Sequence, residues 1–107
     1  MAGLVEIMKQ AQKMKAEVER IQAEVGARTV EGSAGGGMVT VVANGRGELL
    51  SIRIDPEASR EDREMLQDLI LAAGNDALRK ARELLAQEMA RVAGGLGLPG
   101  LPGLLGP

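Results

Sequence analysis

Apolar residues recur every three or four positions over the first quarter of the chain, which is the spacing of one face of a helix. The series is Leu4, Ile7, Ala11, Met14, Val18, Ile21 and Val25. A strict alternation of three and four is also the seam of a coiled coil. The pattern therefore predicts a helix from Leu4 to Val25 that packs through one narrow seam. We expect Gly26 to end this helix in a left-handed cap conformation.

Short alternating segments follow and are typical of antiparallel strands. An extended piece over 27–31 precedes a Gly-rich turn, and the segments 38–43 and 48–54 flank the dipeptide Asn44-Gly45. Asn-Gly is a strong hairpin signal, because both residues tolerate the positive φ of a type I′ turn. The segments predict a three-stranded antiparallel sheet.

We expect the two faces of this sheet to pack against different partners. In the last strand, Leu50, Ile52 and Ile54 point one way, and we expect them to face the core. The opposite face carries Met38, Val42 and Leu49, and it is too apolar to stay entirely in water. A second copy of the chain packed on this face is the simplest way to bury it, so these three residues are the predicted dimer interface.

A second, long helix follows the sheet. Ser59 and Asp62 resemble a capping pattern, which places the start of the helix near Arg60. Its apolar residues form a wide arc that can touch both the sheet and another helix. Gly74 lies in the middle, where it weakens the helix by about 1 kcal/mol relative to alanine and favours a kink or a close crossing.

The chain is long enough for one domain and too short for two, at 107 residues. We predict an α+β domain over 1–93, made of a helix, a three-stranded antiparallel sheet and a long helix that Gly74 could kink. Residues 94–107 read GGLGLPGLPGLLGP, a Gly/Leu/Pro tail that cannot continue a helix. We expect this tail to be disordered.

Composition excludes most catalytic chemistry. The chain has no Cys and no His, so it lacks thiolate zinc sites and the usual acid-base catalyst. The triplet Gly35-Gly36-Gly37 lacks the ending of a phosphate-binding P-loop, and the acidic residues after Ile54 lack EF-hand spacing. We predict no enzyme activity, no catalytic, cofactor or metal site, and no small-molecule substrate.

The N-terminal segment is amphipathic and lacks the features of a secretory signal, and no segment can span a membrane. We therefore expect a cytoplasmic protein without a membrane partner.

Charge is slightly acidic overall but unevenly distributed. The formal net charge is −2, yet residues 1–15 carry three lysines against one glutamate. Any nucleic-acid binding must therefore use a local basic patch. In the first helix, Lys9, Lys13 and Arg20 lie within about 40° of one another, opposite the seam. The full candidate set for DNA contact is Lys9, Lys13, Lys15, Arg20, Arg79, Lys80 and Arg82.

An alternative interpretation of these cations stays open. Glutamates border the basic row of the first helix, and acidic residues stand three or four positions from Arg79 and Lys80. These spacings also fit solvated helix faces with internal ion pairs.

The chain has no Phe, Tyr or Trp, so it lacks the rings on which unpaired bases stack. If the chain binds nucleic acid, we therefore expect it to contact the phosphates of duplex DNA rather than unpaired bases.

An ordered series of motifs runs along the chain. The series comprises Met8-Lys9-Gln10-Ala11-Gln12, the segment Val30 to Gly37, Asn44-Gly45, Ile52-Arg53-Ile54-Asp55-Pro56, Leu66-Gln67-Asp68-Leu69-Ile70, Ala72-Ala73 and Asn75-Asp76-Ala77. It resembles the YbaB/EbfC family of nucleoid-associated proteins. The resemblance runs from about Leu4 to Ala93. It implies an α/β homodimer with helices projecting like the arms of a tweezer, which binds double-stranded DNA in the bacterial nucleoid with little or modest sequence preference. Gly74 departs from the family pattern, because a bulkier residue is more usual there.

Two function classes remain at this point. The first is a nucleoid-associated protein that grips duplex phosphates as a homodimer and affects nucleoid organisation and gene expression. The second is a dimeric scaffold that recognises another protein by helix packing, with incidental DNA binding.

Overall fold

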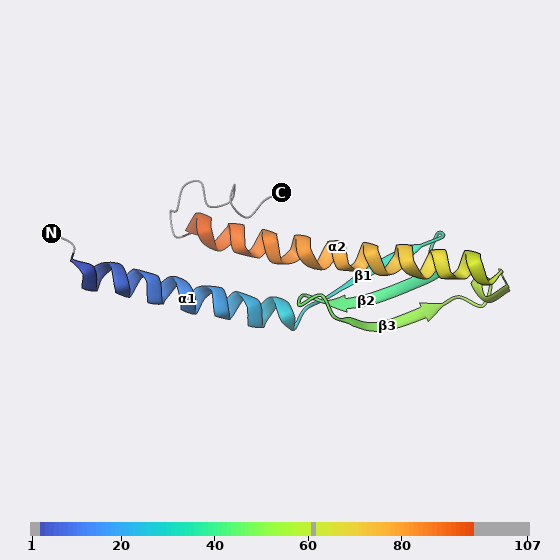
Figure 1. Cartoon of the computed structure of the whole chain (residues 1–107), viewed down its shortest axis with the longest axis horizontal. Coiled ribbons are helices and arrows are strands. Elements are labelled where there is room, and N and C mark those ends of the chain that lie inside the picture. The colour runs from blue at the N-terminus through green and yellow to red at the C-terminus, as the bar shows by residue number, and fades with distance from the viewer. Residues whose placement is uncertain (1–2, 61, 96–107) are drawn as a thin grey trace.

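The computed structural model describes residues 3–60 and 62–95 (Figure 1). Its elements are α1 (Leu4–Gly26), β1 (Thr29–Ala34), β2 (Val39–Asn44), β3 (Leu49–Ile54), a short 3-10 helix (Ala58–Arg60) and α2 (Arg63–Gly95). The strands form one antiparallel sheet in the order β1-β2-β3. This confirms the predicted α+β order of one helix, three strands and one long helix.

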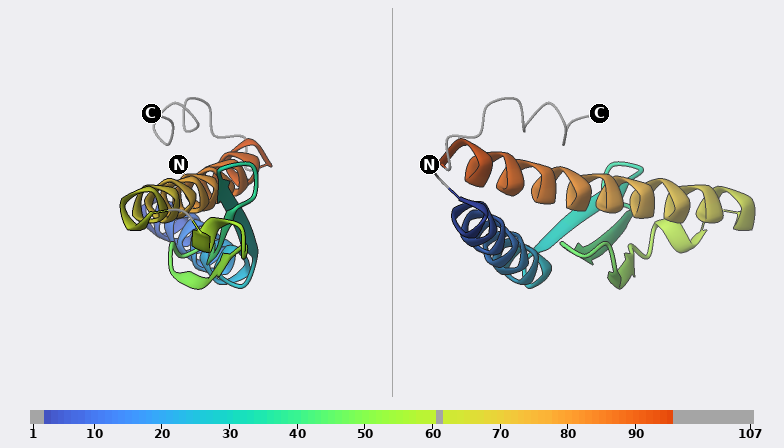
Figure 2. Two further views of the ribbon diagram at one scale, coloured as in Figure 1. Left: turned by 90° about the vertical axis from the view of Figure 1, so that its right-hand side faces the viewer. Right: turned by 60° about the vertical axis from the view of Figure 1, so that its left-hand side comes forward.

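The long helix α2 joins the two ends of the molecule. Its first half lies over one face of the sheet, and its second half runs beside α1 in the opposite direction (Figures 1 and 2). The helix is continuous from Arg63 to Gly95, so Gly74 does not interrupt it. It also includes Gly94 and Gly95, which the sequence assigned to the tail. The rest of the tail, 96–107, lies outside the described residues, and its disorder stays a prediction.

Small residues allow α2 to approach the sheet closely. Ala73 and Ala77 of α2 are fully buried against Val39, Val41 and Ala43 of β2. The neighbouring strand contributes Gly32, which is buried. A Cβ atom added at Gly32 would overlap the backbone nitrogen of Ala77. The core is therefore a close contact between helix backbone and strand backbone. Alanine and glycine are small enough to permit this approach, and the valine side chains fill the remaining space.

The last strand departs from the expected burial. Ile54 pairs with Val39 and Ile52 with Val41, so these side chains share the face that carries α2. They are nevertheless 38% and 50% exposed, and Leu50 is 54% exposed. The expectation that they face the core was wrong as to burial, because α2 lies mainly over β1 and β2.

The turn between β2 and β3 also differs from the predicted type. Asn44 and Gly45 both have negative φ, so this is not a type I′ turn, and Gly47 takes the positive φ of 83° instead. The Asn44 side-chain oxygen accepts hydrogen bonds from the backbone N–H groups of Arg46 and Glu48. Gly45 is required for another reason, since a Cβ there would overlap the carbonyl of Val25 at the end of α1.

Both helices have different ends from those predicted. Gly26 stays helical, and Ala27 caps α1 with φ −85° and ψ −11°, so the left-handed cap was wrong. A Cβ atom at position 26 would meet the side chain of Arg46, which would have to shift. The second helix starts at Arg63 rather than near Arg60, because the Asp62 carboxylate accepts a 2.7 Å hydrogen bond from the N–H of Met65.

Candidate nucleic-acid interface

Two lysines of α1 are the least constrained of the predicted contact residues. Lys9 and Lys13 are exposed, and neither forms a salt bridge or hydrogen bond among residues 3–60 and 62–95, although the charge of Lys13 helps to lower the pKa of Glu17 one turn away. They lie in the half of α1 farthest from the sheet (Figure 1). Their ammonium groups are therefore free to meet an external anion.

Arg20, about two turns beyond Lys13 on the same row, is held by its own helix. Its guanidinium donates to the Glu17 carboxylate at 2.7 Å and to the Glu24 carboxylate at 2.9 Å. The hydrogen bond from Arg20 lowers the pKa of Glu17, and both carboxylates raise the pKa of Arg20. Lys15 is less constrained, since its ammonium lies 4.0 Å from Glu19 and both side chains are mostly exposed. Such a pair contributes little.

The basic cluster of α2 is largely paired. Arg79 binds the carboxylates of Asp76 and Glu83, each at 2.7 Å, and these two hydrogen bonds raise its pKa. Lys80 lies 3.2 Å from Asp76 and donates to the backbone carbonyl of Glu31 at 2.9 Å. Arg82 is exposed and has no such partner in the described part of the chain.

Asp76 is the centre of this cluster. Its carboxylate accepts a 3.1 Å hydrogen bond from the backbone N–H of Ser33, in addition to its contacts with Arg79 and Lys80. These donors, with Ser33 the largest cause, lower the pKa of Asp76 to about 2. Asp76 and Lys80 together tie α2 to β1. Sequence spacing indicated only the pairs within the helix, because a contact to a strand 43 positions away leaves no local pattern.

The predicted cations do not converge on one pocket. Lys80 contacts β1, whereas Lys9 and Lys13 lie on the far half of α1. The structure thus divides the candidate set into free cations (Lys9, Lys13 and Arg82), one weakly paired cation (Lys15) and cations engaged within the fold (Arg20, Arg79 and Lys80).

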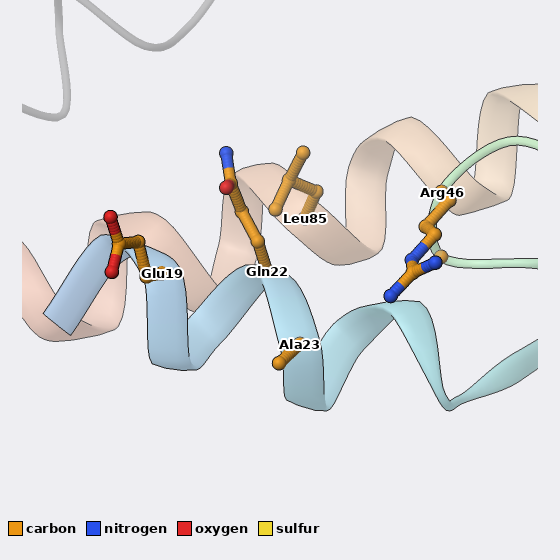
Figure 3. Close-up of a pocket in the computed structure, with 6 residues that line it drawn as sticks. Glu19, Gln22, Ala23, Arg46 and Leu85 are labelled. Atoms are coloured by element: carbon orange, nitrogen blue, oxygen red, sulfur yellow. The ribbon is translucent and has the colours of Figure 1, made fainter. Parts of the chain in front are cut away.

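Arg46 is a further exposed cation that is not among the candidates predicted from the sequence. Arg46 is exposed in the β2–β3 turn, and its side chain extends toward the end of α1 (Figure 3). It borders an open hollow of about 530 Å³ that is also lined by Glu19, Gln22, Ala23, Gly45 and Leu85. In the sequence, the signal that could have pointed to Arg46 is its position directly after the turn dipeptide Asn44-Gly45.

The other chemical possibilities find no support in the described ranges. No group of three or more acidic side chains is placed to hold a metal ion there. Neither helix, as described, carries an apolar stretch long enough to cross a bilayer.

Apolar side chains are exposed mainly in two places. One surface consists of Leu49, Leu50, Ile52 and Ile54 of β3, all at least 38% exposed. The second consists of Leu4, Val5, Ile7 and Met8 at the start of α1, all more than half exposed. Of the predicted dimer interface, Leu49 belongs to the β3 surface, whereas Met38 and Val42 are half-buried.

Residues 1–96 match the family model described as the YbaB/EbfC DNA-binding family. The chain belongs to this family. It is 59% identical over 100 residues to a nucleoid-associated protein of Pelotomaculum thermopropionicum, covering 92% of this chain and 95% of the relative. It is 57% identical over 101 residues to one of Moorella thermoacetica, covering 94% and 97%.

A solved structure supports the same fold. The crystal structure of an uncharacterized protein from Helicobacter pylori superposes with a TM-score of 0.70 at 26% identity, covering 88% of this chain and 96% of that one. The family assignment confirms the resemblance found in the sequence. It also agrees with a binding function rather than an enzymatic one, because the family is described by DNA binding.

Proposed function

We propose that this YbaB/EbfC protein binds duplex DNA as a homodimer, through phosphate contacts and with little sequence preference. It would act at the nucleoid in the cytoplasm and affect nucleoid organisation and gene expression. The family's description and the names of the relatives support the DNA partner. The single structural observation behind the phosphate contact is the unpaired state of Lys9 and Lys13 within the described residues.

Lysines on a helix surface suit phosphates better than bases. An ammonium group on a flexible stem acts as a point charge, and contacts of this kind position a protein without reading sequence. The absence of aromatic side chains removes base stacking as a competing mode. Lys9 and Lys13 would therefore contribute most, with Lys15 and Arg82 as additions. Arg20, Arg79 and Lys80 would each have to weaken an existing ion pair, so we expect smaller contributions from them.

The homodimer is proposed from the apolar surface of β3. Contiguous exposed leucine and isoleucine side chains of this kind are a signal of an interface. The other edge of the sheet is already occupied, since Asp76 and Lys80 of α2 bond to backbone groups of β1. A second copy meeting the β3 side would place two sets of α1 lysines about a two-fold axis. Met38 and Val42, which the sequence predicts as interface residues with Leu49, lie on the other face of the sheet and form the alternative interface.

A salt titration of duplex binding tests the phosphate contact. If the two copies each offer Lys9 and Lys13, about four phosphates are neutralised, and log K should fall against log salt with a slope of about −3.6. The variant Lys9→Glu/Lys13→Glu should lose most of this slope and bind weakly to every sequence. The matched control is Arg60→Glu/Arg63→Glu, which makes the same change in net charge in the 3-10 helix and at the first residue of α2, and it should retain the slope. A wild-type affinity that is independent of salt, or an equal loss in the control, would contradict the proposal.

The scaffold function is the second candidate. It is favoured by the number of cations already engaged in ion pairs and by the exposed apolar start of α1. The same titration separates the two. A protein that shows no duplex binding at physiological salt, yet retains a partner from cell lysate that the variant Ile52→Glu loses, would be a scaffold.

A further inference from the structure

The first helix extends beyond the helix that covers it. Leu85 of α2 and Gln22 of α1 line the same hollow, so the two helices are level at that point. They run in opposite directions and each rises about 1.5 Å per residue. The end of α2 at Gly95 therefore lies near the level of Gln12, and the first two turns of α1 continue past it by about 12 Å. The free end of α1 is visible in Figure 1.

The apolar seam of α1 continues over this uncovered part. Ile21 and Val25 are buried, and Met14 and Val18 are half-buried, where α2 and the sheet are alongside. Beyond the end of α2 the exposed fractions rise to 62% at Ile7 and 72% at Leu4.

Leu4, Ile7 and Met8 are three and four residues apart, so they form one continuous patch on the helix. We call these residues the N-terminal apolar patch. It is a candidate interface because its side chains are large and adjacent.

The segment that follows α2 has matching properties. Residues 96–107 begin where α2 ends, contain five leucines and carry no charged residue. Twelve residues can span up to about 40 Å when extended, which is several times the length of the uncovered helix. Proline and glycine at every second or third position prevent it from continuing α2 as a helix.

We propose that the Leu-rich tail 96–107 folds back onto the N-terminal apolar patch of its own chain, in place of the disorder that its composition alone predicts. The attachment at Gly95 holds the leucines close to the patch, and such tethering gives a high local concentration without any new contact. Burying leucine against Leu4, Ile7 and Met8 removes both apolar surfaces from water.

The basic row would stay accessible in this arrangement. Lys9 and Lys13 lie on the opposite side of α1 from the seam, so the docked tail would leave them exposed. The proposal is therefore independent of DNA binding. The competing occupant of the patch is α1 of a second copy, which the experiment below distinguishes.

Paramagnetic broadening in NMR tests the docking on the full chain. Because the chain has no cysteine, Pro107→Cys can carry a single nitroxide label. The labelled ¹⁵N chain should lose amide signal over residues 4–11 relative to the reduced label, while the β2 amides keep theirs.

A second sample identifies which chain the tail contacts. Unlabelled ¹⁵N protein is mixed with spin-labelled ¹⁴N protein and left to exchange subunits, and it should show no such loss. The absence of broadening in the first sample, or equal broadening in the mixed one, would overturn docking within the chain.

A pair of tail variants tests the apolar contact itself. Leu101→Ser/Leu104→Ser/Leu105→Ser keeps the length and should abolish the broadening, and it should speed hydrogen exchange of the amides of residues 7–11. The control Gly100→Ser/Gly103→Ser/Gly106→Ser adds the same polar groups but keeps the leucines, and it should behave as the parent protein. Broadening that survives the leucine replacements would overturn the proposal.

Discussion

The carboxylate of Asp76, on α2, accepts a 3.1 Å hydrogen bond from the backbone N–H of Ser33, on β1. Lys80, one turn further along α2, donates to the carbonyl of Glu31 on the same strand at 2.9 Å. The long helix therefore bonds both a donor and an acceptor of this strand through its side chains. This satisfies backbone groups that would otherwise be available to another strand. The free side of the sheet is then β3, where the exposed apolar residues lie.

Replacing Asp76 should loosen α2 from the sheet. Asp76→Ala removes an acceptor shared by the Ser33 N–H, Arg79 and Lys80, so we expect the melting temperature to fall by roughly a few degrees. Thermal unfolding followed by circular dichroism measures this. Asp68→Ala is a control on the same helix, because Asp68 is exposed and bonds to no other described residue. Equal effects of the two substitutions would show that the contact to β1 contributes nothing.

The lowered pKa of Asp76 predicts a loss of stability in acid. Folding lowers this pKa from 3.8 to about 2, so the folded state binds fewer protons than the unfolded state in this range. The contribution is complete above the unfolded value and is lost as the pH falls from about 4 to 2. Glu17 and Glu88, whose pKa values are lowered by Arg20 and Arg91, act in the same direction. Urea unfolding across this range should show a flatter dependence for Asp76→Asn, and an unchanged slope would contradict the assignment.

Gly32 should be among the least replaceable residues. A Cβ at this position overlaps the backbone of Ala73 and Ala77, so Gly32→Ala must push α2 away from the sheet. We expect a loss of about 1 to 3 kcal/mol in unfolding free energy. Gly94→Ala serves as a control, because a Cβ there meets open space and alanine favours helix. Chemical denaturation of both variants measures the difference, and equal stabilities would refute the close contact.

Two substitutions on β3 determine which face of the sheet forms the proposed dimer. Ile52 pairs with Val41 on the α2 side, whereas Ser51 pairs with Val42 on the other side. A charge at Ile52 should dissociate a dimer built on the β3 surface, and Ser51→Glu should leave it intact. Sedimentation of Ile52→Glu and Ser51→Glu gives the answer, with circular dichroism to verify folding. The opposite result would favour an interface through Met38 and Val42. If both variants stay dimeric, neither of these two surfaces forms the dimer.

Single neutral substitutions should rank the α1 cations. Lys13→Gln removes an unpaired charge from each copy, so the salt slope should fall by about 2 for a dimer. Arg20→Gln should have a smaller effect, because Glu17 and Glu24 already neutralise this guanidinium. Duplex affinity measured at several salt concentrations tests the order. A larger loss for Arg20→Gln would mean that DNA displaces the internal ion pairs.

Much of the fold was predictable from local signals. The three-four spacing of apolar residues located α1, the alternation on either side of Asn44-Gly45 located the hairpin, and the ordered motifs gave the family. The errors came at positions where distant segments meet. Gly26 was predicted as a left-handed cap, but it is helical, and the side chain of Arg46 in the distant β2–β3 turn lies against it. Likewise, Gly45 has a negative φ and is glycine because the turn abuts the end of α1.

The candidate site was predictable only in part. Lys9, Lys13 and Arg20 share one helix face by their spacing alone, and the sequence left open which of them are paired. The structure distinguishes them, since Arg20 is held by two glutamates and the lysines are not. Arg46 was missed because its position beside α1 depends on the hairpin folding back onto the helix.

The sequence by itself determined the element order, the family and the positions of the cations, because helix period, strand alternation and composition act over a few residues. Only the tertiary structure decided which of those cations are free and which apolar residues stay exposed. Burial, and contacts between elements such as that of Lys80 with β1, depend on which surfaces α2 reaches, and that follows from the fit of Ala73 and Ala77 against Gly32 and β2. A helix that sits over β1 and β2 leaves β3 uncovered, and no local pattern along the chain encodes that choice.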